Sequence, residues 1–222
     1  MSRGYDFQWS IILDNWQVLV AGAWIDIWVS AFGFLLACAI GAAATAFRQS
    51  GIALVRLPLS GYVQVARAIP PYVLLVWVHF GLAALLGLTL TPVQSMLAVL
   101  AFTGGGYASE IFRAGLLAVD RGQVEAGSSL GLGRFDIYRD VVLPQALRIV
   151  VPPLGNVAVS LLKTATLMSV IAVPDMLYLA QNLNMQFFVP FEAFTVVLIV
   201  FVCLVFIVSF ITLALERALA HP

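Results

Sequence analysis

Four ionisable residues lie inside long apolar segments of the chain, two of them cationic (Arg67 and Lys163) and two acidic (Asp26 and Glu110). A charge inside a membrane-spanning segment is costly, so each of these residues is a candidate functional residue. Opposed charges could bind both ends of a zwitterion, with Arg67 or Lys163 toward a carboxylate and Asp26 or Glu110 toward an amine. This pairing is a hypothesis about a solute site inside the membrane.

Arg67 is followed closely by two prolines, Pro70 and Pro71. It lies about 15 Å along a helix that begins near Leu57, which is roughly the middle of a membrane span. Prolines remove backbone donors and break helices, and broken helices near the midplane form substrate sites in several transporters. Two interpretations of Arg67 stay open: a structural ion pair or gate, and contact with a solute.

The other three ionisable residues also have simpler interpretations. Lys163 is expected near the midplane or slightly toward the outer side. Glu110 is expected in the inner half of its segment, where it could pair with Arg113 one turn on or with Arg67. Asp26 could pair with a solute amine or with Arg67, or could face an internal polar crevice.

The chain lacks the patterns of an independent enzyme. A nucleotide-binding P-loop needs Gly-x-x-x-x-Gly-Lys-[Ser/Thr], whereas the single lysine, Lys163, follows two leucines. His79 and His221 are isolated, and no cluster has the spacing of metal ligands. Cys38 and Cys203 lie in separate apolar runs, where small buried thiols are expected. We therefore expect no metal and no cofactor in this chain.

The composition is that of an integral membrane protein. Of 222 residues, 62% are hydrophobic and 10% are charged, with a mean hydropathy of +1.03, whereas soluble domains have about 25% charged residues. The length suffices for roughly five spans in one membrane domain. The net charge of zero does not indicate nucleic acid as a partner. The N-terminal segment lacks the order of a signal peptide, so the spans themselves are expected to direct insertion.

The pattern predicts an all-α fold with five transmembrane helices. The expected spans are about 16–47, 57–86 with an interruption at Pro70 and Pro71, 92–119, 149–171 and 190–215. The segment 173–188 is too short and polar to span, and we expect a short helix at the outer interface, with a plain loop as the alternative. The glycines 104–106 are expected to permit close helix packing, with a hinge as the alternative.

The arginine distribution predicts the orientation, because cytoplasmic loops carry an excess of positive charge. If the polar stretch 120–148 is cytoplasmic, the N-terminus lies outside, the C-terminus lies in the cytoplasm, and only Arg3 lies clearly outside. The arginines at or near the cytoplasmic face are then Arg48, Arg56, Arg113, Arg121, Arg134, Arg139, Arg148 and Arg217.

The stretch 120–148 holds eight of the 22 charges of the chain. Its pattern predicts a helix over 123–130, a turn at Gly131 and a second, amphipathic helix over 134–142 that Pro144 ends. Two interpretations stay open at this point. The stretch is an ordinary cytoplasmic loop, or it is a docking element in which Ala126 and Gly127 allow close approach of a partner and Glu125 offers a charge.

The segment from Gly104 to Asp175 resembles the membrane subunits of ATP-binding-cassette (ABC) importers, specifically the polar amino acid permeases that include histidine and glutamine uptake systems. Segment 67–82, RAIPPYVLLVWVHFGL, adds a weaker match. The family signature is Glu-Ala-Ala, three residues, Gly, about nine residues and Ile-Leu-Pro. The matching residues are Glu125-Ala126-Gly127, Gly131 and Val142-Leu143-Pro144, and the segments EIFRAG, LPQALR, PPLGN and LLK accompany them. This chain departs from the family at Gly127 (often Ala), at Ala68 and Ile69 (Gly-Thr) and at Thr164 (Asp or Asn).

The resemblance implies a type I ABC importer fold with one permease domain over 1–222, in a bacterial inner membrane. It implies that 120–148 forms coupling helices that insert into a cytoplasmic ATPase. The residues implied to couple are Glu125, Ala126, Gly127, Gly131, Leu143 and Pro144, and the candidate solute-pathway residues are Arg67, Pro70, Lys163, Glu110 and Asp26. The implied partners are two ATPase subunits that hold ATP and Mg, a second permease subunit, identical or homologous, and an extracytoplasmic solute-binding protein.

Two functions from different classes fit these features. The first is a permease for a polar amino acid or a related solute such as an opine, ectoine or cystine. The second is a scaffold or sensor subunit that recruits an ATPase without solute passage. Charges inside the membrane favour the permease, because a scaffold gains little from them.

Overall fold

The computed structural model describes residues 5–50 and 52–220, and helices are the only regular elements within these ranges. The α-helices are α1 (Trp9–Asp14), α2 (Trp16–Arg48), α3 (Ala53–Ala68), α4 (Pro71–Val76), α5 (Leu82–Leu86), α6 (Pro92–Leu117), α7 (Arg121–Ser129), α8 (Arg134–Asp136), α9 (Leu143–Ala165), α10 (Met176–Phe187) and α11 (Pro190–Ala220). Two π-helical segments, η1 (Trp77–Gly81) and η2 (Ile137–Val142), and one 3-10 segment, η3 (Thr166–Ile171), join them. The all-α prediction is confirmed. Arg3, on which part of the predicted orientation rests, lies outside the described residues.

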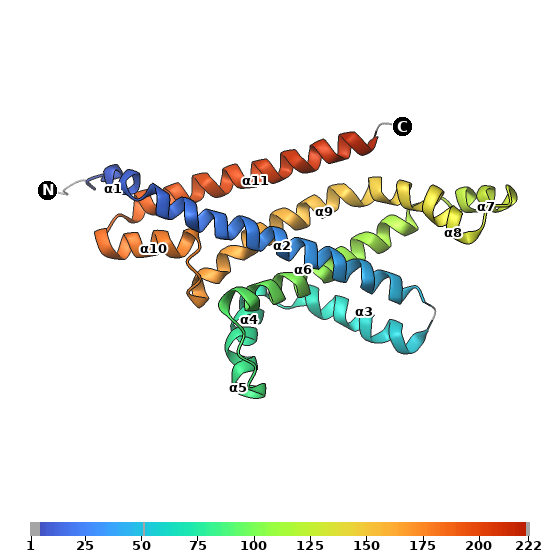
Figure 1. Ribbon diagram of the computed structural model, residues 1–222, viewed down its shortest axis with the longest axis horizontal. Helices are drawn as coiled ribbons and strands as arrows, with labels where there is room; N and C mark the ends of the chain where they lie inside the picture. The colour runs from blue at the N-terminus through green and yellow to red at the C-terminus, as the bar shows by residue number, and fades with distance from the viewer. Residues whose placement is uncertain (1–4, 51, 221–222) are drawn as a thin grey trace.

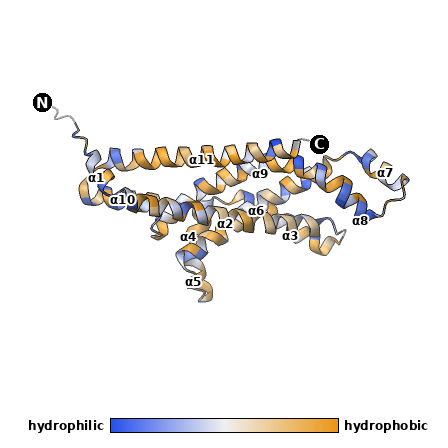
Figure 2. Ribbon diagram, turned by 45° about the horizontal axis from the view of Figure 1, so that its top comes forward, coloured by the Kyte–Doolittle hydropathy of each residue, from blue (hydrophilic) through white to orange (hydrophobic). Residues whose placement is uncertain are grey.

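Three helical runs are long and apolar enough to cross a membrane: Trp16–Arg48, Arg134–Ile171 and Pro190–Leu219. The pair Ala53–Ala68 and Pro71–Leu86 makes a fourth if it counts as one broken span. Figure 2 shows the apolar character of α11 along most of its length and the polar character of α7 and α8. The count of five spans stays a prediction, because α6, although 26 residues long, is not among the helices that are apolar enough to qualify.

Helix α6 has fewer large apolar residues than α11 and packs against several other helices. It packs against α2, α3 and α9 (Figure 1). An added Cβ at Gly104 would lie 2.7 Å from the Cβ of Ala37, and one at Gly106 would lie 2.7 Å from the Cβ of Ala66. Small residues let helix backbones approach closely in membranes. The prediction that these glycines serve close packing is therefore confirmed.

The predicted interruption at Pro70 and Pro71 is a bend of 108° between α3 and α4. Pro70 is the N-cap of α4 and Pro71 stands in its first turn, where a missing backbone N–H needs no partner. Helices α4 and α5 consequently project away from the long helices (Figure 1). The sequence located the break, whereas the angle depends on packing.

The predicted helix stop at Pro144 is wrong. The chain stays helical from Arg134 to Ile171, so the expected fourth span, 149–171, begins within a longer helix. Pro144 stands in the first turn of α9, directly after η2. A π-helical turn has i→i+5 hydrogen bonds, which change the local backbone pairing and accommodate a residue that cannot donate.

The segment expected to be a short helix over 173–188 forms α10 and not a plain loop. The carboxylate of Asp175 caps it by accepting from the N–H of Tyr178 at 2.7 Å. Helix α10 packs against α2 and α11 at one end of the molecule, and the α7–α8 region lies at the other end (Figure 1).

Candidate functional site

The polar hairpin, which we define as residues 120–142, turns at Gly131. The backbone at Gly131 has φ = 80°, in the left-handed region that favours glycine. The N–H of Gly131 donates to the carbonyl of Ser128 at 3.0 Å, and the N–H of Leu132 donates to that of Gly127 at 3.1 Å. This hydrogen-bond pair is a Schellman motif. The expected turn at Gly131 is therefore present, and it requires a left-handed backbone conformation at this residue.

Most residues of the Glu-Ala-Ala signature region are exposed, whereas Gly127 is buried. Gly127 is buried against η2, where an added Cβ would lie 3.1 Å from Cγ1 of Ile137. Glu125 and Ala126 on the same helix are exposed, and so are Leu143 and Pro144 at the start of α9. The four exposed residues are accessible to a partner, while the absence of a side chain at Gly127 allows the two arms of the hairpin to approach closely.

Glu110 lies in a polar network that joins α2 to α6. Its Oε1 is 2.7 Å from Nη1 of Arg48, and its Oε2 is 2.7 Å from Nη2 of Arg113. Nearby, the hydroxyl of Thr45 donates to the carbonyl of Ser109 at 2.9 Å. The expected pair with Arg113 is present. The pair with Arg48 was not expected, and no pair with Arg67 exists among the described residues.

Asp26 is fully buried beneath α10. Its Oδ2 accepts from the N–H of Met176 at 3.2 Å, and that N–H is one of the donors that the first turn of a helix leaves unpaired. Its Oδ1 has no hydrogen-bond partner in the described part of the chain. Asp26 therefore fastens the start of α10 to α2, at the end of the molecule opposite the polar hairpin.

Arg67 and Lys163 are exposed, and no carboxylate lies within 4.0 Å of either in the residues that the structure describes. The guanidinium of Arg67 lies 5.4 Å from the ring centroid of Tyr107, and the Tyr107 hydroxyl donates to the Arg67 carbonyl at 3.5 Å. Among the described residues, neither Arg67 nor Lys163 is thus paired with Asp26 or Glu110.

A pocket of about 330 Å³ opens between α6 and α9 beside the start of α4. The residues that line it are Pro71, Thr103, Tyr107, Asn156, Val157, Ser160, Leu161 and Thr164. Its walls present hydroxyl groups and one amide, on helices that are mainly apolar. Arg67 does not line this pocket, but it contacts Tyr107, which does, and Lys163 precedes Thr164 in the chain.

Sequence reasoning missed the polar lining, although the pattern contains a signal for it. Asn156, Ser160 and Thr164 recur every fourth residue, which places them on one face of α9. Thr103 and Tyr107 have the same spacing on α6. Polar stripes at helical spacing on two segments are a signal that two helices face a common polar space.

Comparison with known proteins gives a consistent result. Residues 33–221 match the model of a family described as the binding-protein-dependent transport system inner membrane component. The chain is 31% identical over 212 residues to the glutamine transport system permease protein GlnP of Escherichia coli strain K12, across 95% of this chain and 97% of that protein. It is 28% identical over 217 residues to the probable amino-acid ABC transporter permease protein YckA of Bacillus subtilis strain 168, across 98% and 96% of the two chains.

Solved structures show the same architecture. A chain in the crystal structure of an amino acid ABC transporter with histidines superposes with a TM-score of 0.90 at 25% identity, over 96% of this chain and all of that one. A chain of the inward-facing MetNI methionine ABC transporter superposes with a TM-score of 0.75 at 22% identity, over 94% and 99% of the two chains. The second likeness concerns the fold alone.

Proposed function

The chain belongs to the family of binding-protein-dependent transport system inner membrane components, and we propose that it carries a polar amino acid or a similar small polar solute across the inner membrane into the cytoplasm. The single observation that carries this assignment is the polar pocket between α6 and α9. The relatives named for glutamine and amino-acid transport support the choice of solute class.

The chemistry of the pocket suits such a solute. Ligand pockets range upward from about 300 Å³, and a pocket of about 330 Å³ accepts a solute of amino-acid size. The hydroxyls of Thr103 and Thr164 donate to the carbonyls of Val99 and Ser160 and can accept from a solute. The Ser160 hydroxyl and the Asn156 amide can both donate and accept. The exposed cation of Arg67 lies beside Tyr107 and is available to a solute carboxylate. A purely apolar solute would gain nothing from these groups.

In this proposal the polar hairpin and the start of α9 couple the chain to ATP hydrolysis by a separate subunit. We assign docking of an ATPase subunit to the exposed residues Glu125, Ala126, Leu143 and Pro144, with Gly131 setting the turn. In this assignment two ATPase subunits bind ATP and Mg, and the chain itself performs no catalysis. A second permease subunit, identical or homologous, completes the pathway, and a solute-binding protein delivers the solute at the outer face. The N-terminus then lies outside and the C-terminus in the cytoplasm.

The test is uptake by the complete transporter reconstituted in proteoliposomes with its binding protein and labelled glutamine, histidine and cystine. The double variant Asn156→Leu/Ser160→Leu removes two polar groups from the pocket. Because each hydrogen bond to a solute contributes about 1 kcal/mol, we expect KM to rise about ten-fold or more while the complex still assembles.

The matched control is Gln64→Leu, which removes an exposed polar group of α3 outside the pocket lining. Unchanged solute dependence in the double variant would contradict the assignment of the pocket. ATPase recruitment by the chain without uptake of any of the three solutes would favour the scaffold or sensor function instead.

A further inference from the structure

We infer that the groove between the polar hairpin and the adjacent ends of α2 and α6 binds an anionic phospholipid, with its charged headgroup between Arg121 and Arg134 and an acyl chain in the apolar continuation of the groove. This inference goes beyond solute transport. It rests on the shape, the charge and the apolar continuation of the groove.

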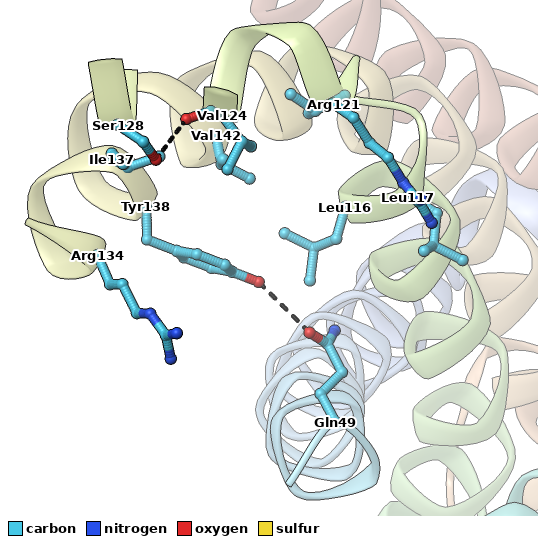
Figure 3. A pocket seen from close by; sticks show the side chains of 11 residues that line it. Gln49, Leu116, Leu117, Arg121, Val124, Ser128, Arg134, Ile137, Tyr138 and Val142 are labelled. Atoms are coloured by element: carbon cyan, nitrogen blue, oxygen red, sulfur yellow. Dashed lines mark hydrogen bonds between the residues drawn. The ribbon is translucent and has the colours of Figure 1, made fainter. Parts of the chain in front are cut away.

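The head of the groove is a pocket of about 450 Å³ (Figure 3). Its floor is apolar and includes Leu116, Ile137 and Val142. The ring of Tyr138 extends across it from the hairpin, and its hydroxyl donates to Oε1 of Gln49 at the end of α2 at 3.5 Å. The pocket therefore lies between the hairpin and the helix ends, where a lipid headgroup region would meet the protein.

Two cations stand at the edges of this pocket. Figure 3 shows Arg121 and Arg134 on opposite sides of it, with Leu116 and Tyr138 between them. Neither guanidinium has a carboxylate within 4.0 Å among the described residues. Arg139 on the same hairpin, by contrast, is paired with Asp140 at 2.7 Å. The pocket thus presents two uncompensated positive charges over an apolar floor, which is complementary to a phosphate attached to a hydrocarbon.

The groove continues as a second pocket of about 260 Å³ between α2, α6 and α9. The two pockets share Gln49, Leu116 and Tyr138. The continuation is lined mainly by apolar residues, namely Ala42, Ala46, Phe112, Leu143, Ala146, Leu147 and Val150. The helices α2 and α9 that line this part of the groove belong to runs that are apolar enough to cross a membrane, and in this inference an acyl chain of a lipid at the cytoplasmic surface enters it. A soluble anion would leave it unfilled, so the geometry favours a lipid.

A lipid in this position would contact both arms of the hairpin and the ends of two long helices. It would therefore stabilise the position of the hairpin relative to the spans. Anionic lipid would then affect how strongly a displacement of the hairpin is coupled to α2 and α6. Basic pockets between spans on the cytoplasmic side are a known means of lipid recognition.

The experiment measures lipid retained by the complete transporter complex in detergent, by native mass spectrometry with added phosphatidylglycerol or phosphatidylcholine. Each arginine near an anionic lipid surface contributes about a five-fold increase in affinity, so Arg121→Gln/Arg134→Gln should weaken phosphatidylglycerol binding about 25-fold. The matched control Arg56→Gln changes an exposed arginine outside the groove and should bind as the unchanged protein does.

A second pair of variants tests the apolar part without changing a charge. Ala42→Trp fills the acyl portion of the groove and should reduce retention of phosphatidylglycerol, whereas Ala43→Trp on the neighbouring, exposed position should not. This pair keeps the test decisive if the arginine variant fails to assemble. The measurement does not depend on solute transport, so failure here would leave the proposed permease function standing.

Three results would overturn the inference. Equal retention of phosphatidylglycerol by Ala42→Trp and Ala43→Trp would remove the acyl site. Displacement of the bound lipid by inorganic phosphate alone would show that the arginines form a soluble-anion site. A photo-crosslinking residue at Tyr138 that labels the ATPase subunit and no lipid would show that a protein partner fills the groove.

Discussion

Arg48 of α2 and Glu110 of α6 form an ion pair in which Nη1 and Oε1 are 2.7 Å apart. Arg113 occupies the other carboxylate oxygen at the same distance. The side chains of Arg48 and Glu110 are only 15% and 22% exposed, so solvent screens this pair weakly. The network joins two long helices at the end that carries the polar hairpin, which assigns Glu110 a structural role before any role toward solute.

We expect Glu110→Gln to lower the free energy of unfolding by about 1–3 kcal/mol, because two arginines lose their shared counter-ion. KM for the solute should not change. Thermal unfolding of the detergent-solubilised complex and uptake kinetics check the two expectations. The free energy of unfolding should fall less in the double variant Arg48→Met/Glu110→Gln than the sum of the decreases in the two single variants. A large rise in KM at unchanged stability would place Glu110 in the solute pathway.

Gly131→Asp should leave the protein inserted in the membrane but abolish uptake and transport-coupled ATP hydrolysis. An added Cβ at Gly131 has no neighbour within 4 Å in the described chain, so the cost inside the subunit is limited to the left-handed backbone, about 1 kcal/mol. The larger effect comes from a charged side chain at the surface proposed to meet the ATPase. Full uptake by this variant would contradict the docking assignment.

Gly131→Asn is the matched control, because asparagine tolerates the left-handed region and has nearly the same shape without the charge. It should retain more coupled ATP hydrolysis than the aspartate variant. Membrane insertion of both variants is checked by immunoblotting of washed membranes. Equal activity of the two would show that charge at this turn is unimportant.

Arg67→Ala and Asp26→Asn should differ in their effect on solute recognition. Arg67 contacts Tyr107 of the pocket, and losing one favourable contact with a solute carboxylate should raise KM about five-fold or more. Asp26 is buried under α10, so Asp26→Asn should leave KM unchanged. Solute-stimulated ATPase activity in proteoliposomes measures both. An unchanged response in the Arg67 variant would remove this residue from the site.

Gly155→Val should destabilise the contact between α9 and α11. An added Cβ at Gly155 would lie 2.1 Å from Cγ2 of Thr212, so the helices would have to separate, at a cost of about 1–3 kcal/mol. Thr212→Ala in the same chain should recover part of the loss. Gly61→Ala, where an added Cβ meets nothing within 4 Å, is the control and should not lower the melting temperature. Unchanged stability of Gly155→Val would show that α11 does not pack as described.

Local pattern alone was enough to predict most helices. The first expected span, 16–47, corresponds to α2 (Trp16–Arg48), and the third, 92–119, corresponds to α6 (Pro92–Leu117). The capping box at Thr91 and Gln94 explains why α6 begins where it does. Hydropathy, helix caps and prolines act over a few residues, so their effects can be predicted from a short stretch of sequence.

The same local rules failed where a neighbouring turn changed the backbone. Pro144 was expected to end a helix, yet it follows the π-helical segment η2 and the helix continues. A proline disrupts a helix only where its missing N–H and its ring conflict with the preceding turn. The width of that turn depends on how η2 packs against α7 and α9, which no short window of sequence contains.

The sequence by itself determined that this protein is a helical membrane protein of the importer family, where most of its helices lie, and that the chain turns at Gly131. Only the tertiary structure decided that Glu110 pairs with Arg48, that Asp26 fastens α10, and that the stripes Thr103–Tyr107 and Asn156–Ser160 face one pocket. Helix formation depends on neighbours within one or two turns, whereas the partners of a buried charge or a polar stripe depend on which helices pack together and at what angle.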